Sequence, residues 1–192
     1  MSPVVEGRSC GSCTLCCKLM GVEEIGKPRG IWCIHCDPRK GCKIHGQHPE
    51  ECRNFLCGYL TNAGIGEIWN PNKCRMVLTY AEKGVPRLSV HVDPARAGIW
   101  RQPPYHAELK RFARAAAQSR AQVIVWEGRK AIAVLPDRDK ELGEVKAEQF
   151  IVTTEVMGRD GTMLDVVVLD GNDPRFLAIK ARSAPPKSSA PR

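Results

Sequence analysis

"PPYHAELKRFARAAAQSRAQVIVWEGRKAIAVLP", residues 103–136, places a helical pattern directly before a strand pattern. Pro103 and Pro104 suit the start of a helix, and the Ala, Leu, Lys and Arg that follow favour its body. Apolar residues at helical spacing predict a side that faces the core: Leu109, Phe112, Ala113 and Ala116. Residues 122–136 predict a β-hairpin that turns at Glu127–Arg129.

Strand patterns lie on both sides of this stretch. Residues 75–81 and 87–93 predict two strands around the turn at 82–86, and residues 148–171 predict a hairpin that turns at Gly158–Gly161. Asp160 belongs to that solvated tip rather than to a metal site. Consecutive hairpins with a single helix predict an α+β region over 75–180, a mostly antiparallel sheet with one packed helix. Residues 181–192, rich in Pro, Ser and Ala, predict a disordered tail.

All ten cysteines of the 192-residue chain lie before residue 75. Region 1–74 is also rich in Gly and Pro and shows little sustained periodicity, so it cannot bury much apolar area. Such a region needs a cross-link to be stable, and a bound metal ion is the obvious one. We therefore predict a loop-rich cysteine-cluster metal-binding region over 1–74.

The spacing of the cysteines suits a metal. Cys10–Cys13, Cys13–Cys16 and Cys33–Cys36 are C-x2-C pairs, and such a pair can place two sulfurs ~3.8 Å apart on one zinc ion with Zn–S bonds of ~2.3 Å. The run C-x2-C-x2-C also opens the bacterial ferredoxin motif, whose further ligand comes from elsewhere in the chain. Disulfides and buried free thiols are the rival interpretations.

The adjacent pair Cys16–Cys17 is the unusual feature of "CGSCTLCC", residues 10–17. In a helix, Cys10, Cys13 and Cys17 share a face; in a turn, Cys10, Cys13 and Cys16 group instead. Either way the neighbours are expected to serve different partners, such as two metal centres, or one centre and a redox thiol.

The candidate metal ligands are Cys10, Cys13, Cys16, Cys17, Cys33, Cys36, Cys42, Cys52 and Cys57. Cys74 is expected to be a buried free thiol. Whether His35, His45 and His48 are ligands, hydrogen-bond partners of ligands or packing residues stays open, as does whether Arg53 bonds thiolates or lies on the surface. His91 and His106 are predicted surface or packing residues.

Residues 8–60 resemble the CxxCxxCC cysteine-cluster family, a zinc- or iron-chelating domain. "CGSCTLCC" matches its N-terminal motif, and "GCKIHGQHPEECRNFLC", residues 41–57, matches its second segment. His45 and His48 stand where the family usually has Tyr and Arg. The resemblance implies chelation of zinc or iron, including iron in a [4Fe–4S] cluster. A relative, the flagellin lysine methylase, makes a methyl-transfer role conceivable.

Composition narrows the functional classes. The N-terminus lacks a secretory signal pattern and no stretch is apolar enough to span a membrane, so we expect a cytoplasmic protein without a membrane partner. The net charge is +8, and its densest basic stretch has the spacing of a solvated helix face, which argues against nucleic acid as a partner: Lys110, Arg111, Arg114 and Arg120. Motifs of hydrolases and nucleotide-binding enzymes are absent. Three hypotheses remain: a non-catalytic metal-binding protein, an iron–sulfur protein with a redox or methyl-transfer role, and a zinc-dependent nucleic-acid-binding module.

Overall fold

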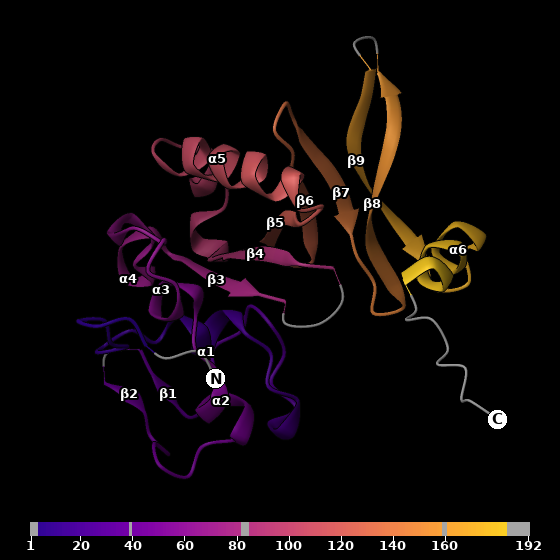
Figure 1. The fold of residues 1–192 in the computed structure, drawn as a ribbon. Helices are drawn as coiled ribbons and strands as arrows, with labels where there is room; N and C mark the ends of the chain where they lie inside the picture. Colours follow the sequence, from indigo (N-terminus) through magenta and orange to yellow (C-terminus); the bar gives the residue numbers. More distant parts are fainter. Residues whose placement is uncertain (1–3, 39, 82–84, 159–160, 184–192) are drawn as a thin grey trace, which may run out of the picture.

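The computed structural model describes residues 4–38, 40–81, 85–158 and 161–183. They form an α+β fold, as predicted, with most strand pairs antiparallel and a loop-rich N-terminal part (Figure 1). No helix in these ranges has the length and apolar character needed to cross a membrane.

Short elements make up the N-terminal part. Within its described residues no helix exceeds 5 residues, and the two strands of its ribbon have 2 residues each. In chain order the elements are α1 (Leu15–Leu19), η1 (Glu23–Ile25), β1 (Cys36–Asp37), β2 (Gly41–Cys42), α2 (Glu50–Asn54), α3 (Gly58–Thr61), η2 (Glu67–Trp69) and α4 (Pro71–Cys74). Helices this short are marginal by themselves, so packing must hold them.

Five strands among the described residues between Met76 and Glu144 form a sheet in the order β3-β4-β5-β6-β7. Its strands are β3 (Met76–Tyr80), β4 (Arg87–Val92), β5 (Gln122–Glu127), β6 (Lys130–Val134) and β7 (Asp139–Glu144). The strands predicted at 75–81 and 87–93 and the hairpin over 122–136 are confirmed; part of the turn between the first two, residues 82–84, lies outside the described residues.

One pairing in this sheet was not expected. β4 and β5 pair in parallel, which requires a crossover connection. η3 (Pro94–Arg96), η4 (Ile99–Arg101) and α5 (Tyr105–Gln118) supply it. α5 is the predicted helix: Leu109 and Ala113 are buried beneath it, and Phe112 and Ala116 pack against the same core.

The chain ends with elements outside this sheet. β8 (Gln149–Gly158) and β9 (Gly161–Asp170) form the predicted hairpin as a separate ribbon, whose tip at 159–160 lies outside the described residues. Ile151 and Val166 attach it to the sheet by packing against Ile124 and Ala133. α6 (Pro174–Ser183) follows. This second longer helix was missed, and it extends into the stretch from 181 that was predicted to be disordered; residues 184–192 lie outside the described residues.

The two faces of the sheet bury different parts of the chain. Met76, Leu78, Val90 and other residues face a core beneath α5, to which the N-terminal part contributes Tyr59, Leu60, Ile65, Trp69 and Cys74. On the opposite face, Val77 packs against Leu15 and Leu19 of α1. In Figure 1, α5 and the cysteine-rich loops accordingly lie on opposite sides of β3 and β4.

A buried carboxylate also holds α1 to the sheet. Asp93, at the end of β4, is fully buried, and Lys18 of α1 and Arg75 each approach it to 2.6 Å. Burial opposes ionisation of Asp93, but hydrogen bonds from Lys18, from the backbone N–H of Ala95 and from Arg75 outweigh it, so the pKa of this carboxyl lies below its usual value. The helix that carries Cys16 and Cys17 is therefore fixed to β4 by apolar and ionic contacts.

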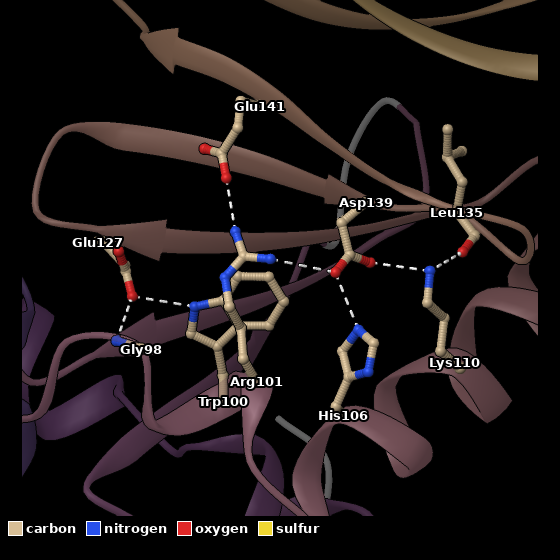
Figure 2. A network of polar contacts seen from close by, with 9 residues as sticks. All are labelled: Gly98, Trp100, Arg101, His106, Lys110, Glu127, Leu135, Asp139 and Glu141. Atoms are coloured by element: carbon tan, nitrogen blue, oxygen red, sulfur yellow. Dashed lines mark hydrogen bonds and ion pairs between the residues drawn. The ribbon is translucent and has the colours of Figure 1, made fainter.

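A second ionic network fixes β7, the strand that was not predicted (Figure 2). Asp139 of β7 accepts a hydrogen bond from His106 Nε2 at 2.9 Å, and Arg101 lies 3.3 Å away. Lys110 Nζ lies 2.8 Å from Oδ1 of Asp139 without an aligned hydrogen bond and donates to Leu135 O at 2.7 Å. Each charged group named here has a protein partner. We therefore interpret the network as one that stabilises the fold. His106, predicted as a surface or packing residue, is one of its members.

Candidate metal centre

The octet Cys10–Cys17 combines the two conformations that its sequence left open. The N–H of Cys13 donates to Cys10 O at 2.8 Å and closes a turn, and α1 begins two residues later at Leu15. Leu15 and Leu19 fix the rotation of α1 by packing on Val77. The turn and the helix together direct the thiols of the octet toward two places.

Arg8 brings the turn next to α3. Its guanidinium donates to the carbonyl oxygens of Asn62 at 3.0 Å and Ile65 at 2.7 Å, and also to that of Tyr59. The N–H of Val5 donates to Leu60 O at 2.8 Å. Because Cys57 is the N-cap residue of α3, these contacts place a cysteine that is distant in sequence beside Cys10 and Cys13.

Four cysteines line one cavity of about 70 Å³: Cys10, Cys13, Cys16 and Cys57, here called the cavity group. Apolar side chains make much of the remaining wall, including Phe55, Leu60 and Val77, with Asn70 and Asn72 as polar members. This grouping corresponds to the alternative in which Cys10, Cys13 and Cys16 come together and Cys17 points aside.

Three thiols of the cavity group have a raised pKa: Cys10, Cys13 and Cys57. Burial raises the pKa of Cys10, and the neighbouring thiols of Cys57, Cys13 and Cys17 raise it further. Burial also raises the pKa of Cys13 and of Cys57. Backbone N–H groups oppose this effect because they bond the sulfurs and favour the thiolate. The N–H of Leu15 bonds Cys13, and those of Leu60 and Tyr59 bond Cys57. A metal ion would therefore have to displace protons here, and the N–H groups would then bond the resulting thiolates.

The other five candidates form a second set, here called the loop group: Cys17, Cys33, Cys36, Cys42 and Cys52. The thiols of Cys17 and Cys36 are hydrogen-bonded to each other, and Cys36 faces Cys42 across the β1–β2 ribbon. The N–H of Cys33 donates to Cys17 O at 3.0 Å. Cys52 of α2 interacts electrostatically with Cys17, Cys33 and Cys42.

Within the loop group, the pKa of Cys17, of Cys36 and of Cys52 is raised. Burial, followed by the charge of Cys17, raises the pKa of Cys36 to about 12. A hydrogen bond with Cys16 and then burial raise the pKa of Cys17. Cys16 and Cys17 thus touch each other while Cys16 lines the cavity and Cys17 bonds Cys36, so the adjacent cysteines serve different surroundings, as the sequence suggested.

The thiols of each group are close but not yet arranged as ligands. Across the described residues, no three His, Cys, Asp or Glu side chains already converge on one point as a metal site. The donor set itself fits a soft divalent metal or an iron–sulfur cluster: thiols at C-x2-C spacing, backbone N–H groups on two sulfurs, and cations nearby. Coordination would have to be completed by the metal, as in small metal-dependent domains.

The remaining candidates have other contacts. His45 and His48 stack with ring centroids 5.1 Å apart, and His48 Nδ1 accepts a hydrogen bond from the N–H of Gly46 at 3.0 Å. Arg53 is exposed and donates to His48 O at 3.2 Å, which favours its interpretation as a surface residue. Cys74 is buried, as expected; its sulfur bonds the backbone of Met76, and burial raises its pKa to about 12.

His91 is a packing residue, as predicted. It is buried in β4 and its Nε2 lies 3.1 Å from Thr79 Oγ1. Burial, with a smaller effect of the Arg29 charge, lowers the pKa of His91 to about 3. The imidazole therefore stays neutral and structural at neutral pH.

Comparisons with known proteins give no match: no family model, no curated protein and no solved structure corresponds to this chain. The candidate centre is therefore defined by its own residues.

Sequence reasoning missed two features of the site. One is the apolar wall of the cavity, which comes from segments 55–60 and 70–72 and from β3. The other is Lys27, a buried lysine whose charge interacts with Cys33, Cys17, Cys16 and Cys52. Neither carries a spacing signal, because an isolated lysine or a wall formed by distant segments has no pattern along the chain.

Proposed function

We propose that this chain is a metal-binding protein that chelates zinc or iron through its N-terminal cysteines, in a non-catalytic role. One observation carries the proposal. The fold brings nine thiols from separate segments into two adjacent groups, in a part of the chain whose helices and strands are too short to be stable alone. Metal–thiolate bonds would supply the missing stability.

The cavity group would hold one metal centre and the loop group another. The resemblance of residues 8–60 to the CxxCxxCC cysteine-cluster family supports the same function. When bound, the metal would cross-link the segments that supply the ligands. The chain's own contribution is to orient the thiols, through the turn at Cys10–Cys13, the packing of α1 on Val77 and the capping position of Cys57.

The cavity group also favours a second candidate, an iron–sulfur protein with a redox or methyl-transfer role. Cys10, Cys13 and Cys16 have the C-x2-C-x2-C spacing of a cluster motif, and Cys57 stands beside them as a fourth cysteine from elsewhere. A [4Fe–4S] cluster takes four cysteine ligands, and an apolar surrounding tunes its potential. The partly apolar wall of the cavity suits such a cluster.

A nucleic-acid-binding role has less support. Three of the four basic residues in the densest stretch form ion pairs with acidic residues: Lys110 with Asp139, Arg111 with Glu108 and Arg120 with Glu155. Side chains neutralised in this way offer a phosphate backbone less positive charge.

Anaerobic purification followed by elemental analysis and visible spectroscopy tests the proposal. Two zinc ions per chain without colour would support a closed structural role and exclude the cluster. Four irons with acid-labile sulfide and broad absorption near ~400 nm would support the cluster. A chain without stoichiometric metal would contradict both.

Matched variants assign the ligands. Cys57→Ser should lose the metal of the cavity group, whereas Cys74→Ser, at a buried thiol bonded to its own backbone, should keep the wild-type metal content. Equal metal content in both variants would contradict the ligand assignment.

A further inference from the structure

Lys27 is fixed beneath the last turn of α1. Its backbone pairs with Val22 through two hydrogen bonds of 2.9 Å, and the residue is 9% exposed. The ε-ammonium donates to Lys18 O at 3.0 Å and to Met20 O. An ammonium has three N–H donors, so these carbonyls account for two of them.

This buried charge has no carboxylate counter-ion in the part of the chain that the structure describes. Among the described residues, no carboxylate forms an ion pair with Lys27, whereas the neighbouring Lys18 is paired with Asp93 at 2.6 Å. Buried lysines are almost always paired, because removing an ammonium from water costs much free energy. Two carbonyl dipoles compensate this cost only in part.

Thiols lie close enough to Lys27 to interact with its charge. Its charge interacts with Cys33, Cys17, Cys16 and Cys52. These residues come from α1, from the loop before β1 and from α2, and three of them belong to the loop group. Neutral thiols supply no counter-charge, but four thiolates on one divalent metal ion carry a net charge of −2.

We propose that Lys27 is the buried counter-charge of an anionic tetrathiolate centre in the loop group, formed by Cys17, Cys33 and Cys52 with Cys36 or Cys42, which takes a soft divalent cation such as Zn²⁺ or Fe²⁺. This inference rests on the proposed metal-binding function and deepens it. Lys27 acts through the ligands as a positioning residue: its ammonium stabilises the charge of the loaded centre, and its remaining N–H is available to a thiolate sulfur.

The two thiol groups differ in their cation. For the cavity group, the cation that acts on Cys13 is Arg75, which also pairs with Asp93. Lys27 interacts with three members of the loop group but with only Cys16 of the cavity group. Loss of the Lys27 charge should therefore weaken metal binding at the loop group much more than at the cavity group.

The test is an anaerobic titration of the reduced full-length protein with Co²⁺, monitored by its thiolate charge-transfer and d–d absorption in competition with a chelator. Lys27→Met removes the charge and keeps most of the stem. An ion pair a few Å apart contributes a favourable electrostatic energy at an effective dielectric constant of ~20. After screening, we expect its loss to lower the affinity for Co²⁺ by about 10- to 100-fold. One equivalent of Co²⁺ should bind that much more weakly, and the affinity of the other equivalent should change much less.

Two further variants control for charge and fold. Lys27→Arg keeps the charge and should bind within about threefold of the wild type. Lys43→Met removes an exposed charge next to Cys42 and should also be neutral. If Lys27→Met fails to fold without metal, circular dichroism makes the same comparison. The Co²⁺ concentration needed to fold Lys27→Met should exceed that for the wild type, and Lys27→Arg should restore folding at the wild-type concentration.

The outcomes separate this inference from the proposed function. Tight binding of both equivalents to Lys27→Met overturns the role of Lys27 and leaves metal binding intact. A Lys27→Arg protein as weak as Lys27→Met also overturns it, because charge would then not be the cause. A wild-type protein that binds no Co²⁺ overturns the proposed function, and the inference fails with it.

Discussion

Asp93 provides the sharpest test of how the cysteine-rich part is attached to the sheet. Asp93→Asn preserves the size of the side chain and the oxygen that accepts from the N–H of Ala95 at 3.0 Å. It removes the negative charge that faces Lys18 and Arg75 at 2.6 Å each. Any loss of stability therefore reports the contacts with Lys18 and Arg75, including the amide N–H₂ that would face Arg75, rather than a cavity or a lost cap.

The magnitude follows from burial. Removing one partner of a fully buried pair costs about 3–5 kcal/mol. The side chains of Lys18 and Arg75 are 15% and 35% exposed, so both cations regain some water when the partner is lost. We expect the free energy of unfolding to fall by about 2–3 kcal/mol at pH 7, measured by urea denaturation of the metal-free protein.

The pH dependence has a definite sign. The pKa of Asp93 is lower in the folded protein than in the unfolded chain, so its ionised form contributes stability above the unfolded pKa of ~3.9. That contribution is lost as the pH falls through the folded pKa. The difference between wild type and Asp93→Asn should therefore shrink below about pH 4.

Asp173→Asn is the matched control, because Asp173 pairs with Arg175 on the surface. Its urea midpoint should equal that of the wild type. Equal midpoints for Asp93→Asn and the wild type at pH 7 would refute the reasoning, as would a difference that is the same at every pH.

Two other substitutions test the packing of α3 on β3 and the ionic network around Asp139. Gly58→Ala would place its Cβ 2.8 Å from Cε2 of Tyr80 and 3.2 Å from Cβ of Leu78, so we expect a loss of about 1–3 kcal/mol in urea denaturation; Gly66→Ala, whose Cβ meets no atom within 4 Å, is the control, and equal stability of the two would contradict the close approach of α3 to β3. Asp139→Asn should cost about 1–2 kcal/mol. Burial opposes ionisation of Asp139, but Lys110 and His106 lower its pKa, so the cost should be present at neutral pH and fade in acid; a cost that grows on acidification would show that the network in Figure 2 is not ionic.

The elements with strong local patterns were predictable from the sequence. α5 and the strands β3, β4, β5, β6, β8 and β9 each combine periodicity with turn residues, and the structure confirms them. β7 was missed because its sequence DKELGE is polar and the strand lies at the sheet edge, where ionic contacts of Asp139 hold it. The parallel pairing of β4 with β5 depends on how α5 packs, which no local pattern encodes. α6 was missed because its few apolar residues directly precede the Pro- and Ser-rich end.

The grouping of the candidate ligands could not be predicted from the sequence. Spacing supplied the list of candidate cysteines, which stays a prediction, and it indicated two destinations for Cys16 and Cys17. It could not show that Cys57 joins Cys10 and Cys13, because that meeting depends on Arg8 and α3. It could not identify Lys27 either, because its significance arises from burial with no carboxylate partner among the described residues.

The anchoring of α1 to Val77 and Asp93 has a consequence for biosynthesis. A ribosome releases residues 10–57 first, and at ~5–20 residues per second the strands that orient α1 follow on the order of seconds later. During that interval the nascent chain exposes its thiols before the scaffold that sorts them into two groups exists. If the chain binds metal as proposed, correct metallation depends on when the ion arrives, because an early ion meets thiols that are not yet sorted into two groups. Expression in metal-limited cells, with metal supplied after synthesis, should therefore give a more uniform metal content than expression in metal-rich medium.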